Sequence, residues 1–335
     1  MKNFHPLSKD DSSVQHLFDV AYAFQKSMVF LTACELEIFT VLGNKTKSSK
    51  EIAYETGTDE RATERLLNAL CALSLLIKRE GKFANTKTTL QYLVKDQPEF
   101  LGSMVHLNHY WERWTTLTES IKLGTAAKYK DISEKSDEWL SSFIASLHWE
   151  SKLQAPEVIT AIGPGKFKKI LDLGGGSGAF SMEFARSKPD AEIFLFDLPR
   201  IIKFARHYLS EAQFADRIKT IEGDYLTDSI GKGYDLVFMS AILPLHTIWE
   251  NISLAQKVYD SLNPGGYIVI HNQLISDNRT QPLESTLTSL NLLVNTKAGD
   301  VYTETEIWII LKEAWFNDIF RRNTGFGTSL MIGNK

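Results

Sequence analysis

The sequence predicts an α/β protein in which a mainly helical N-terminal region precedes a domain built on a parallel sheet. Two observations support this prediction. Apolar residues recur at helical spacing up to about residue 160, and beyond it short apolar runs alternate with amphipathic segments. That alternation is typical of parallel strands joined by crossover helices. We expect an N-terminal domain over residues 1–100, a helical connector over 101–163 and the sheet domain over 164–335.

In the N-terminal domain, residues 15–43 are expected to form one helix. Ser48 and Glu51 have the spacing of a capping box at the start of a second helix. Thr58 is expected to cap a third helix, and the runs LIKRE and FANT around a glycine turn predict a β-hairpin. Helices followed by such a hairpin make a winged helix.

Composition narrows the possible partners and the compartment. The 335 residues carry a net charge of −4, so no global positive field draws the protein to nucleic acid or to an anionic membrane. The two cysteines, Cys34 and Cys71, lie in helix-like stretches, which favours a reducing compartment over a disulfide scaffold. The first residues lack the apolar core of a signal peptide, and the longest apolar run, residues 236–245, is too short to cross a bilayer. We therefore expect a cytoplasmic protein without nucleic-acid or membrane partners.

Residues 100–160 are expected to be helical and are rich in aromatic side chains. A packed core and a cavity for a flat ligand use the same aromatic residue types, so the sequence leaves both interpretations open. Beyond this segment, four runs are expected to be strands: KKILDL, AEIFLFD, YDLVFMSAIL and GGYIVIHNQL. The segments between them have helical patterns.

A glycine-rich turn, DLGGGSG, follows the first of these strands and precedes a helix. Glycines at a strand-to-helix turn let a ligand approach the backbone closely, so Gly174 and Gly176 are candidate cofactor contacts. Together with Ala179 they also fit the dinucleotide fingerprint G-x-G-x-x-A. Spacing alone therefore does not separate a nicotinamide cofactor from S-adenosylmethionine (SAM).

Asp172 ends the strand in front of this turn, and its charge favours SAM. A carboxylate that faces the turn would repel a pyrophosphate placed on the N-terminus of the following helix. It would attract SAM, which carries an ammonium and a sulfonium and no phosphate. We therefore expect Asp172 to contact SAM; alternatively, it only caps the turn that follows.

Two further acids end the next strand regions. Asp197, in FLFDLPR, is expected to hold the ribose hydroxyls, with Leu198 beside it. Asp224, in EGDYL, is expected to accept a hydrogen bond from the adenine amino group, with Tyr225 packed against the ring. Alternatively, Asp197 is a helix N-cap and Asp224 a turn aspartate. Ligands of open α/β sheets bind at the carboxyl ends of the strands, so three acids there together favour a binding site.

These motifs, with the NPGG turn at 263–266 and the tail PLESTLTSLNLLVNT…YTETEIWIILKEAWF, resemble the SAM-dependent small-molecule O-methyltransferases related to acetylserotonin and caffeate methyltransferases. The resemblance covers nearly the whole chain. It implies a Rossmann-like class I methyltransferase domain behind a winged-helix dimerisation domain. It also implies SAM as the cofactor, a small aromatic acceptor methylated at a hydroxyl, and a homodimer. We expect the dimer to pair apolar side chains of the N-terminal helices, namely Leu31, Leu36, Ile38 and Phe39.

By the same resemblance, Ser151 and Ser240 lie near the methionine part of SAM. The residues that match the lining of the acceptor cavity are Phe143, Leu147, Trp114 and Asn291. The sequence does not identify the acceptor molecule, and it leaves methylation at oxygen, nitrogen or carbon open.

The chain departs from the family at the general base. Many members place a catalytic histidine just after the fourth strand, where an ungapped match puts Pro244, with His246 two residues later. Proline cannot accept a proton. Three accounts remain: His246 reaches the site through a shifted loop, another histidine such as His148 or His271 serves, or the acceptor needs no protein base. We take His246 as the candidate catalytic residue.

Three other functions remain open in the sequence. A DNA-binding regulator would use the winged helix, but the helix DERATERLLNALCALS mixes acidic with basic residues, whereas a groove-reading helix needs net positive charge. A nicotinamide-dependent oxidoreductase would fit the glycine turn, and a catalytically impaired methyltransferase-like binding protein would fit Pro244. No metal is expected, because His106, His109 and His148 have no Cys or acidic ligands at standard spacing.

Overall fold

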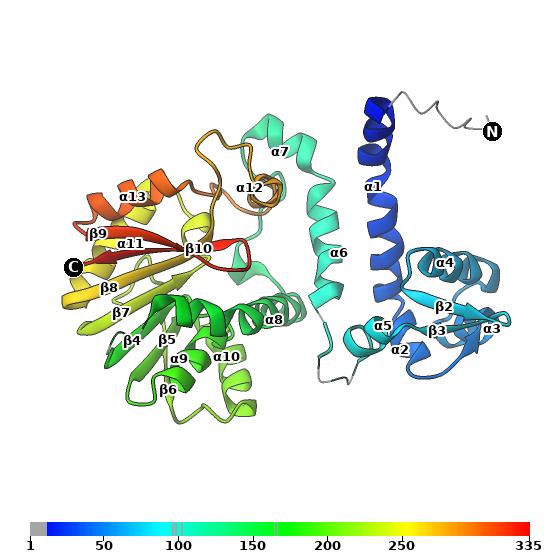
Figure 1. The fold of residues 1–335 in the computed structure, drawn as a ribbon, viewed down its shortest axis with the longest axis horizontal. Coiled ribbons are helices and arrows are strands. Elements are labelled where there is room, and N and C mark those ends of the chain that lie inside the picture. Colours follow the sequence, from blue (N-terminus) through cyan, green and yellow to red (C-terminus); the bar gives the residue numbers. More distant parts are fainter. Residues whose placement is uncertain (1–11, 96, 98, 102, 164, 166) are drawn as a thin grey trace. The chain divides into compact units, whose positions relative to one another are not determined.

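The structure is a computed structural model that describes residues 12–95, 97, 99–101, 103–163, 165 and 167–335. The first residues, on which the expectation about a signal peptide rests, lie outside this described part. The chain forms two compact units, Met1–Asn108 and His109–Lys335 (Figure 1). The division expected at residues 100 and 163 stays a prediction. In the described part of the chain, no helix is both long enough and apolar enough to cross a membrane.

The N-terminal unit has the helices and the hairpin of a winged helix. β2 and β3 pair antiparallel, and β1 joins them in the order β1-β3-β2. The capping box of Ser48 and Glu51 is confirmed at the start of α3. The elements are α1 (Ser12–Glu35), α2 (Ile38–Leu42), β1 (Lys47–Ser48), α3 (Ser49–Thr56), α4 (Glu60–Ala72), β2 (Leu76–Arg79), β3 (Lys82–Asn85) and α5 (Lys87–Tyr92).

Two helix boundaries differ from the prediction. The helix expected over residues 15–43 is interrupted, because Glu37 adopts a left-handed backbone conformation (φ 54°) between α1 and α2. The N-cap of α4 is Asp59, whose carboxylate accepts a hydrogen bond from the third backbone N–H of the helix. Thr58 instead pairs its hydroxyl with that of Thr63.

The apolar side chains expected at a dimer contact lie mostly inside the N-terminal unit. Leu31, Ile38 and Phe39 are buried in the core of this unit, and Leu36 packs against that core. The prediction that they pair across a dimer is therefore wrong for the buried three. They are buried because the chain turns back after α1 and packs α2 against it. The exposed apolar side chains of α1 lie nearer its start and are Leu17, Val20, Tyr22 and Phe24.

The C-terminal unit contains a seven-stranded sheet in the order β6-β5-β4-β7-β8-β10-β9. α6 (Ser103–Trp114) leads into this unit. The further helices are α7 (Leu117–Leu123), η1 (Ile132–Glu134), α8 (Asp137–Ile162), α9 (Ala179–Ser187), α10 (Pro199–Glu211), η2 (Leu243–Leu245), α11 (Ile248–Ser261), α12 (Leu283–Asn295) and α13 (Glu304–Glu313). The strands are β4 (Lys169–Leu173), β5 (Glu192–Asp197), β6 (Ile218–Glu222), β7 (Tyr234–Ser240), β8 (Leu262–Gln273), β9 (Asn317–Asn323) and β10 (Thr328–Asn334).

The strands from β6 to β8 are parallel, as predicted, whereas β10 runs antiparallel to both β8 and β9. The sequence pattern did not predict this antiparallel hairpin at the end of the chain. Strand order reverses at β4, because β5 follows it on one side and β7 lies on the other. In open α/β sheets, ligands bind outside the carboxyl ends of the strands at such a reversal.

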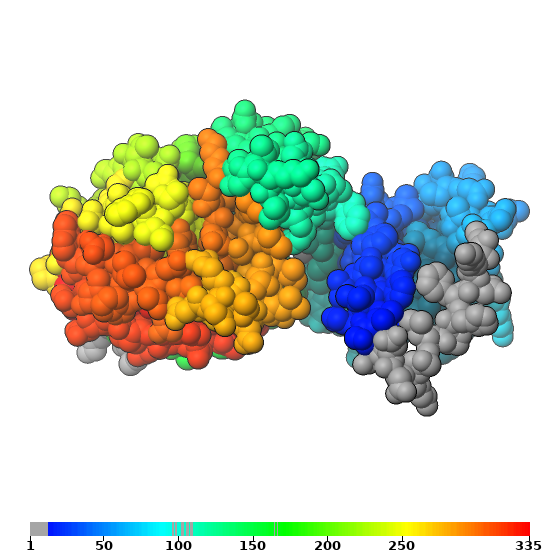
Figure 2. All heavy atoms as spheres, turned by 90° about the horizontal axis from the view of Figure 1, so that it is seen from above, coloured from blue at the N-terminus to red at the C-terminus, as the bar shows by residue number. Residues whose placement is uncertain are grey.

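Helices cover both faces of the sheet (Figure 1). Side chains of α8, α9 and α10 form one core against it, and side chains of α11 and α13 form the other. α7 rests against the region of α12, turquoise and orange in Figure 2, where the Thr125 hydroxyl donates to the Lys297 carbonyl at 2.9 Å. The carboxyl edge of the parallel strands is therefore bordered by α8 and by the segments that follow β6, β7 and β8.

Candidate active site

The glycine-rich turn joins β4 to α9 at the carboxyl edge of the sheet. Gly174, Gly176 and Gly178 have φ angles of 69°, 57° and 83°, a left-handed conformation that strains other residues. A Cβ at Gly174 would lie 2.3 Å from Cδ1 of Ile242, whereas a Cβ at Gly176 would meet nothing within 4 Å. The turn is therefore packed tightly at Gly174 and leaves open space at Gly176.

Asp197 fastens this turn to the end of β5. Its Oδ2 accepts a hydrogen bond from the Gly176 N–H at 2.9 Å, and its Oδ1 accepts one from the Leu198 N–H at 2.7 Å. Burial raises the pKa of Asp197 to about 6, although the two backbone donors act to lower it. Each oxygen of an ionised carboxylate can accept a second hydrogen bond. The group can therefore hold the turn and still bind a pair of hydroxyls.

Asp172 lies beneath the turn. Its side chain is 1% exposed, its Oδ2 accepts a hydrogen bond from the Ser181 hydroxyl at 2.6 Å, and a Cβ at Gly175 would lie 2.9 Å from its carboxyl carbon. Burial raises the pKa of Asp172 to about 7, and nearby Asp197 adds to this effect. Asp172 thus supports the turn from within the core, and its expected contact with SAM stays a prediction.

Asp224 and Tyr225 follow β6 at the same edge. Oδ1 of Asp224 accepts a hydrogen bond from the Leu226 N–H at 2.9 Å, which is the turn geometry that the sequence left open as an alternative. Tyr225 lies against the glycine turn, with its Cε1 3.7 Å from a Cβ built on Gly174. Its hydroxyl contacts Nε2 of His246 at 2.8 Å, and the two rings meet edge to face. The candidate base is therefore one side chain away from the turn.

The protonation of this pair follows from its burial. Burial lowers the pKa of the His246 imidazole, while Glu250 and Asp224 partly offset this effect. Burial also raises the pKa of the Tyr225 hydroxyl, so that hydroxyl keeps its proton. His246 is thus a neutral imidazole whose Nε2 pairs with a neutral phenol.

The two alternative bases are held differently. His271 of β8 bonds the Ser240 hydroxyl through Nδ1 at 2.9 Å and the Thr328 hydroxyl through Nε2 at 2.8 Å. His148 of α8 bonds the Ser177 hydroxyl through Nδ1 at 2.9 Å and stacks on a tyrosine of α10. Burial lowers the pKa of each histidine to about 4. Both are neutral at physiological pH, and His271 already uses both ring nitrogens.

The residues expected to line the acceptor cavity come together in two pairs. Nε1 of Trp114 donates to Oδ1 of Asn291 at 3.1 Å, and a second amide one turn later on α12 donates to the same oxygen. Phe143 and Leu147 lie on α8 in an apolar cluster that packs against α10. Ser151, expected near the methionine part of SAM, lies one turn further along α8 and is half-buried.

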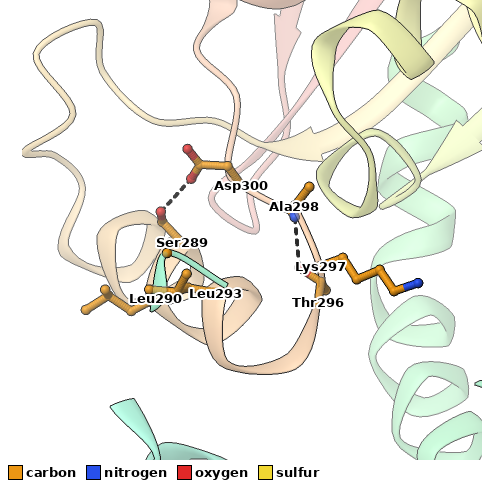
Figure 3. Close-up of a pocket in the computed structure, with 9 residues that line it drawn as sticks. Ser289, Leu290, Leu293, Thr296, Lys297, Ala298 and Asp300 are labelled. Carbon is orange, nitrogen blue, oxygen red and sulfur yellow. Dashed lines mark hydrogen bonds between the residues drawn. The ribbon is translucent and has the colours of Figure 1, made fainter. Parts of the chain in front are cut away.

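A cavity of about 310 Å³ lies between the end of α7, α12 and the loop that follows α12 (Figure 3). Inside it, the Ser289 hydroxyl donates to Asp300. The backbone N–H of Asp300 in turn donates to the Pro244 carbonyl at 3.1 Å. The loop therefore supports the segment that carries Pro244. The residues expected to bind the cofactor or the acceptor do not line this cavity, whose wall is Gly124, Ser289, Leu290, Leu293 and residues 296–300.

Two contacts at the site were not predicted from the sequence. Ser181, which holds Asp172, stands nine positions later in the first turn of α9, so local spacing could have suggested it. The contact between His148 and Ser177 joins positions 29 apart on different elements, and no local pattern points to it. Interactions of the second kind require the fold.

Among the described residues, no three His, Cys, Asp or Glu side chains are grouped so that they could hold a metal ion. The side chains of His106 and His109, which the sequence interpretation treated as ordinary helix histidines, lie outside the described residues.

Two family models match the chain. An O-methyltransferase domain matches residues 122–317, and an O-methyltransferase dimerisation domain matches residues 18–95. The acetylserotonin O-methyltransferase of Gallus gallus is 32% identical over 96% of this chain and 97% of its own length. The 3-hydroxy-5-methyl-1-naphthoate 3-O-methyltransferase of Streptomyces sahachiroi is 29% identical over 90% of this chain and 89% of its own length.

The fold agrees with these relatives. The crystal structure of human N-acetylserotonin methyltransferase in complex with SAM has a TM-score of 0.87 at 26% identity, and the match covers 98% of this chain and 99% of that one. The Rossmann-like methyltransferase fold, the enzyme class and the cofactor predicted from sequence are thus confirmed. The findings favour a methyltransferase over the DNA-binding regulator, the oxidoreductase and the impaired binding protein. The chain belongs to the family of SAM-dependent small-molecule O-methyltransferases.

Proposed function

We propose that this O-methyltransferase holds SAM across the β4–α9 turn and its aromatic acceptor beside Trp114 and Asn291. The observation that supports the proposal is the hydrogen bond between Asp197 and the turn. One carboxylate fixes the Gly176 N–H and keeps acceptor capacity for two hydroxyls. Open space over Gly176 lets a ligand approach the backbone at that point.

The residues around the turn fit the parts of SAM. We assign the ribose hydroxyls to Asp197 and the adenine ring to the space between Leu198 and Tyr225, with Asp224 near its amino group. Asp172 and Gly174 shape the turn that receives the cofactor. The methionine end is assigned to Ser240, at the end of β7 beside β4, and to Ser151 on α8. This set offers apolar surface for a base and oxygen acceptors for hydroxyls and an ammonium, with no cluster of cations for a pyrophosphate.

When bound, SAM supplies a methyl group on a sulfonium, which is already activated for displacement. An acceptor hydroxyl held in line with that sulfonium would take up the methyl group and lose its proton, and sulfur would keep the electron pair of the broken bond. The chain contributes position, which can supply ~7–11 kcal/mol of such a barrier. We assign this positioning to Trp114 and Asn291, whose mutual hydrogen bond fixes the indole, and to Phe143 and Leu147 on α8.

We assign the departing proton to His246. Its neutral imidazole can accept a proton, and its contact with Tyr225 places it beside the turn. Because Nε2 already pairs with the Tyr225 hydroxyl, the proton reaches it either through that hydroxyl or after the pair opens. Pro244 leaves no other side chain at the usual position of the base.

Two variants distinguish these routes. Calorimetry with SAM, and S-adenosylhomocysteine formation with a panel of phenols, establish binding and turnover in the wild type. His246→Ala should then lower kcat by about 10²-fold or more, because a general base typically contributes that much. Tyr225→Phe should lower it equally if the hydroxyl relays the proton, and far less if the pair opens. A His246→Ala rate within about twofold of wild type would remove His246 as the base.

We also propose a homodimer that uses the exposed apolar side chains of α1. Leu17 and Val20 are 67% and 64% exposed, and the dimerisation-domain match begins at residue 18. Val20→Asp should shift the mass measured by light scattering from dimer toward monomer, because it places a charge in the contact. Tyr54→Asp, at an 89% exposed side chain of α3, is the control and should stay dimeric. A monomeric wild type at micromolar concentration would contradict the proposal.

A further inference from the structure

A chain of hydrogen bonds runs through the core beside the proposed methionine end of SAM. Nδ1 of His271 contacts the Ser240 hydroxyl at 2.9 Å, and its Nε2 contacts the Thr328 hydroxyl at 2.8 Å. The Thr328 hydroxyl also contacts that of Thr324, and Thr324 donates its proton to the Thr328 carbonyl at 2.9 Å. Four side chains from β7, β8 and the β9–β10 turn are thus linked in series.

The hydrogen bond from the Thr324 hydroxyl to the Thr328 carbonyl gives this series of hydrogen bonds a direction. Thr324 gives its single hydroxyl proton to a carbonyl, so its oxygen accepts the proton of Thr328. Thr328 can then only accept from His271, which requires the hydrogen on Nε2. A neutral imidazole with its hydrogen on Nε2 has a lone pair on Nδ1, so Ser240 donates to that nitrogen. The lone pairs of Ser240 are left for a ligand.

The surroundings keep the His271 imidazole neutral. Its side chain is 4% exposed and packs against the rings of Phe180 and Phe238. Burial lowers its pKa to about 4, so the imidazole is neutral at physiological pH. Its carbonyl also accepts a hydrogen bond from the Ala241 N–H at 3.0 Å, which ties the end of β7 to β8.

Ser240 is the end of the chain that reaches the crevice. It is the last residue of β7 and is half-buried, in contrast to His271. The residue before it, Met239, pairs with Leu173 of β4, so Ser240 stands beside the start of the glycine turn. A hydroxyl oxygen here can meet the part of a ligand that extends from the turn toward β7.

We propose that His271 is a positioning residue that holds Ser240 as a hydrogen-bond acceptor for the α-ammonium of SAM. The inference rests on the proposed SAM site. The opposite tautomer would donate from Nδ1 to Ser240, which would occupy one lone pair of the serine oxygen and free its proton to rotate toward the ammonium. Thr324 and Thr328 therefore select the tautomer of His271. That tautomer orients the Ser240 hydroxyl so that its oxygen lone pairs are available to a cation.

Thr328→Val tests this selection, because valine keeps the volume but removes the acceptor for the Nε2 hydrogen. We expect calorimetry to show SAM bound about tenfold more weakly, the effect of losing a hydrogen bond to a charged group. The kcat at saturating SAM should stay within about twofold of wild type, since the reacting atoms keep their positions. In ¹⁵N spectra of labelled imidazoles, the signals of His271 should exchange their Nδ1 and Nε2 character.

The control is Ser329→Ala, the next residue on β10, which is more buried than Thr328 and points to the opposite face of the sheet. It should leave both the SAM affinity and the His271 tautomer unchanged. If Thr328→Val does not fold, Thr324→Val at the far end of the chain should give the same tautomer exchange. A wild type that fails to bind SAM would overturn the proposed function itself. A wild type that binds SAM, with a variant that keeps both affinity and tautomer, would overturn only this inference.

Discussion

The cofactor side and the acceptor side of the active site are held by different kinds of contact. On the cofactor side, Asp172 meets Ser181 nine positions later, and Gly176 meets Asp197 at a separation of 21. On the acceptor side, Trp114 meets Asn291 at a separation of 177. The first side is built from one turn and two adjacent strands. The second depends on how distant helices pack, so we expect its shape to vary more readily between relatives.

Burial acts on both sides, with opposite effects on the pKa of acids and of bases. It raises the pKa of Asp172 and Asp197, and it lowers that of His148, His246 and His271. In each case the uncharged form is favoured. Burial therefore makes charge costly at the two carboxylates until a cationic ligand compensates it, and it keeps the three histidines neutral.

Among substitutions on the cofactor and acceptor sides, we expect the largest effect in the glycine-rich turn. Gly174→Ala should weaken SAM binding on the order of 100-fold, because the Cβ would overlap Ile242 and the left-handed backbone would be strained. Gly265→Ala is the matched control, since it has a φ of 75° but open space around its Cβ. It should cost about 1 kcal/mol of stability and leave calorimetric SAM affinity unchanged. Equal effects of the two variants would show that strain alone, not the close approach, decides the result.

A smaller effect is expected where the turn meets β5. Asp197→Ala should weaken SAM binding by ~1–3 kcal/mol, the cost of losing a charged hydrogen-bond partner. Glu222→Gln, at an exposed carboxylate that ends the adjacent strand, is the control and should bind SAM as the wild type does. Unchanged calorimetric affinity in Asp197→Ala would remove this residue from the cofactor site.

The buried acid beneath the turn makes stability depend on pH in an unusual direction. The pKa of Asp172 in the folded state, about 7, lies above the value of about 4 expected in the unfolded chain, so the folded state binds more protons. Its contribution to stability is complete below about pH 4 and is lost as pH rises to about 7.

Asp172→Asn removes this titration and keeps an oxygen for Ser181. In urea unfolding, the variant should be more stable than wild type by roughly 1–3 kcal/mol at pH 8 and nearly equal to it at pH 4. The opposite order at pH 8 would mean that the ionised carboxylate is stabilised by contacts beyond Ser181.

Whether a contact joins residues that are near or distant in sequence also decides how much of the site could be predicted. The glycine turn and the acid that ends β5 stand in local patterns, and the structure brings them together. The orientation of Asp172 was not predictable, because strand alternation does not say whether a carboxylate faces a ligand or the core. The prediction of the dimer contact was wrong for a related reason. The helical spacing of Leu31 indicates that its side chain is buried, but it does not say whether that side chain packs against its own chain or against a second copy.

At Pro244, the sequence shows that the usual base is missing. Only the fold shows that His246 pairs with Tyr225 and that His271 is fully engaged. Both facts depend on contacts between strands and loops that are distant in sequence. Local pattern therefore identifies the cofactor chemistry, whereas the proton chemistry requires tertiary structure.

The smallest expected effect tests whether the two sides are independent. His148 of α8 contacts Ser177 in the glycine turn, so it joins the acceptor helix to the cofactor side. His148→Phe keeps a ring to stack on Tyr208 but loses this hydrogen bond, and Ser177→Ala loses it from the other end. Each should cost about 1 kcal/mol in urea unfolding, and the double variant should cost less than the sum because the two act on one interaction.

Kinetics of the same variants show which substrate the contact between His148 and Ser177 helps to bind. If only the KM for SAM rises, the contact serves the turn, and the two sides work separately. If the KM for the acceptor rises with it, α8 transmits the state of the turn to Phe143 and Leu147, which lie on the same helix. Additive unfolding energies would show instead that His148 and Ser177 do not interact in solution. The contact between α8 and the turn would then have no part in holding either substrate.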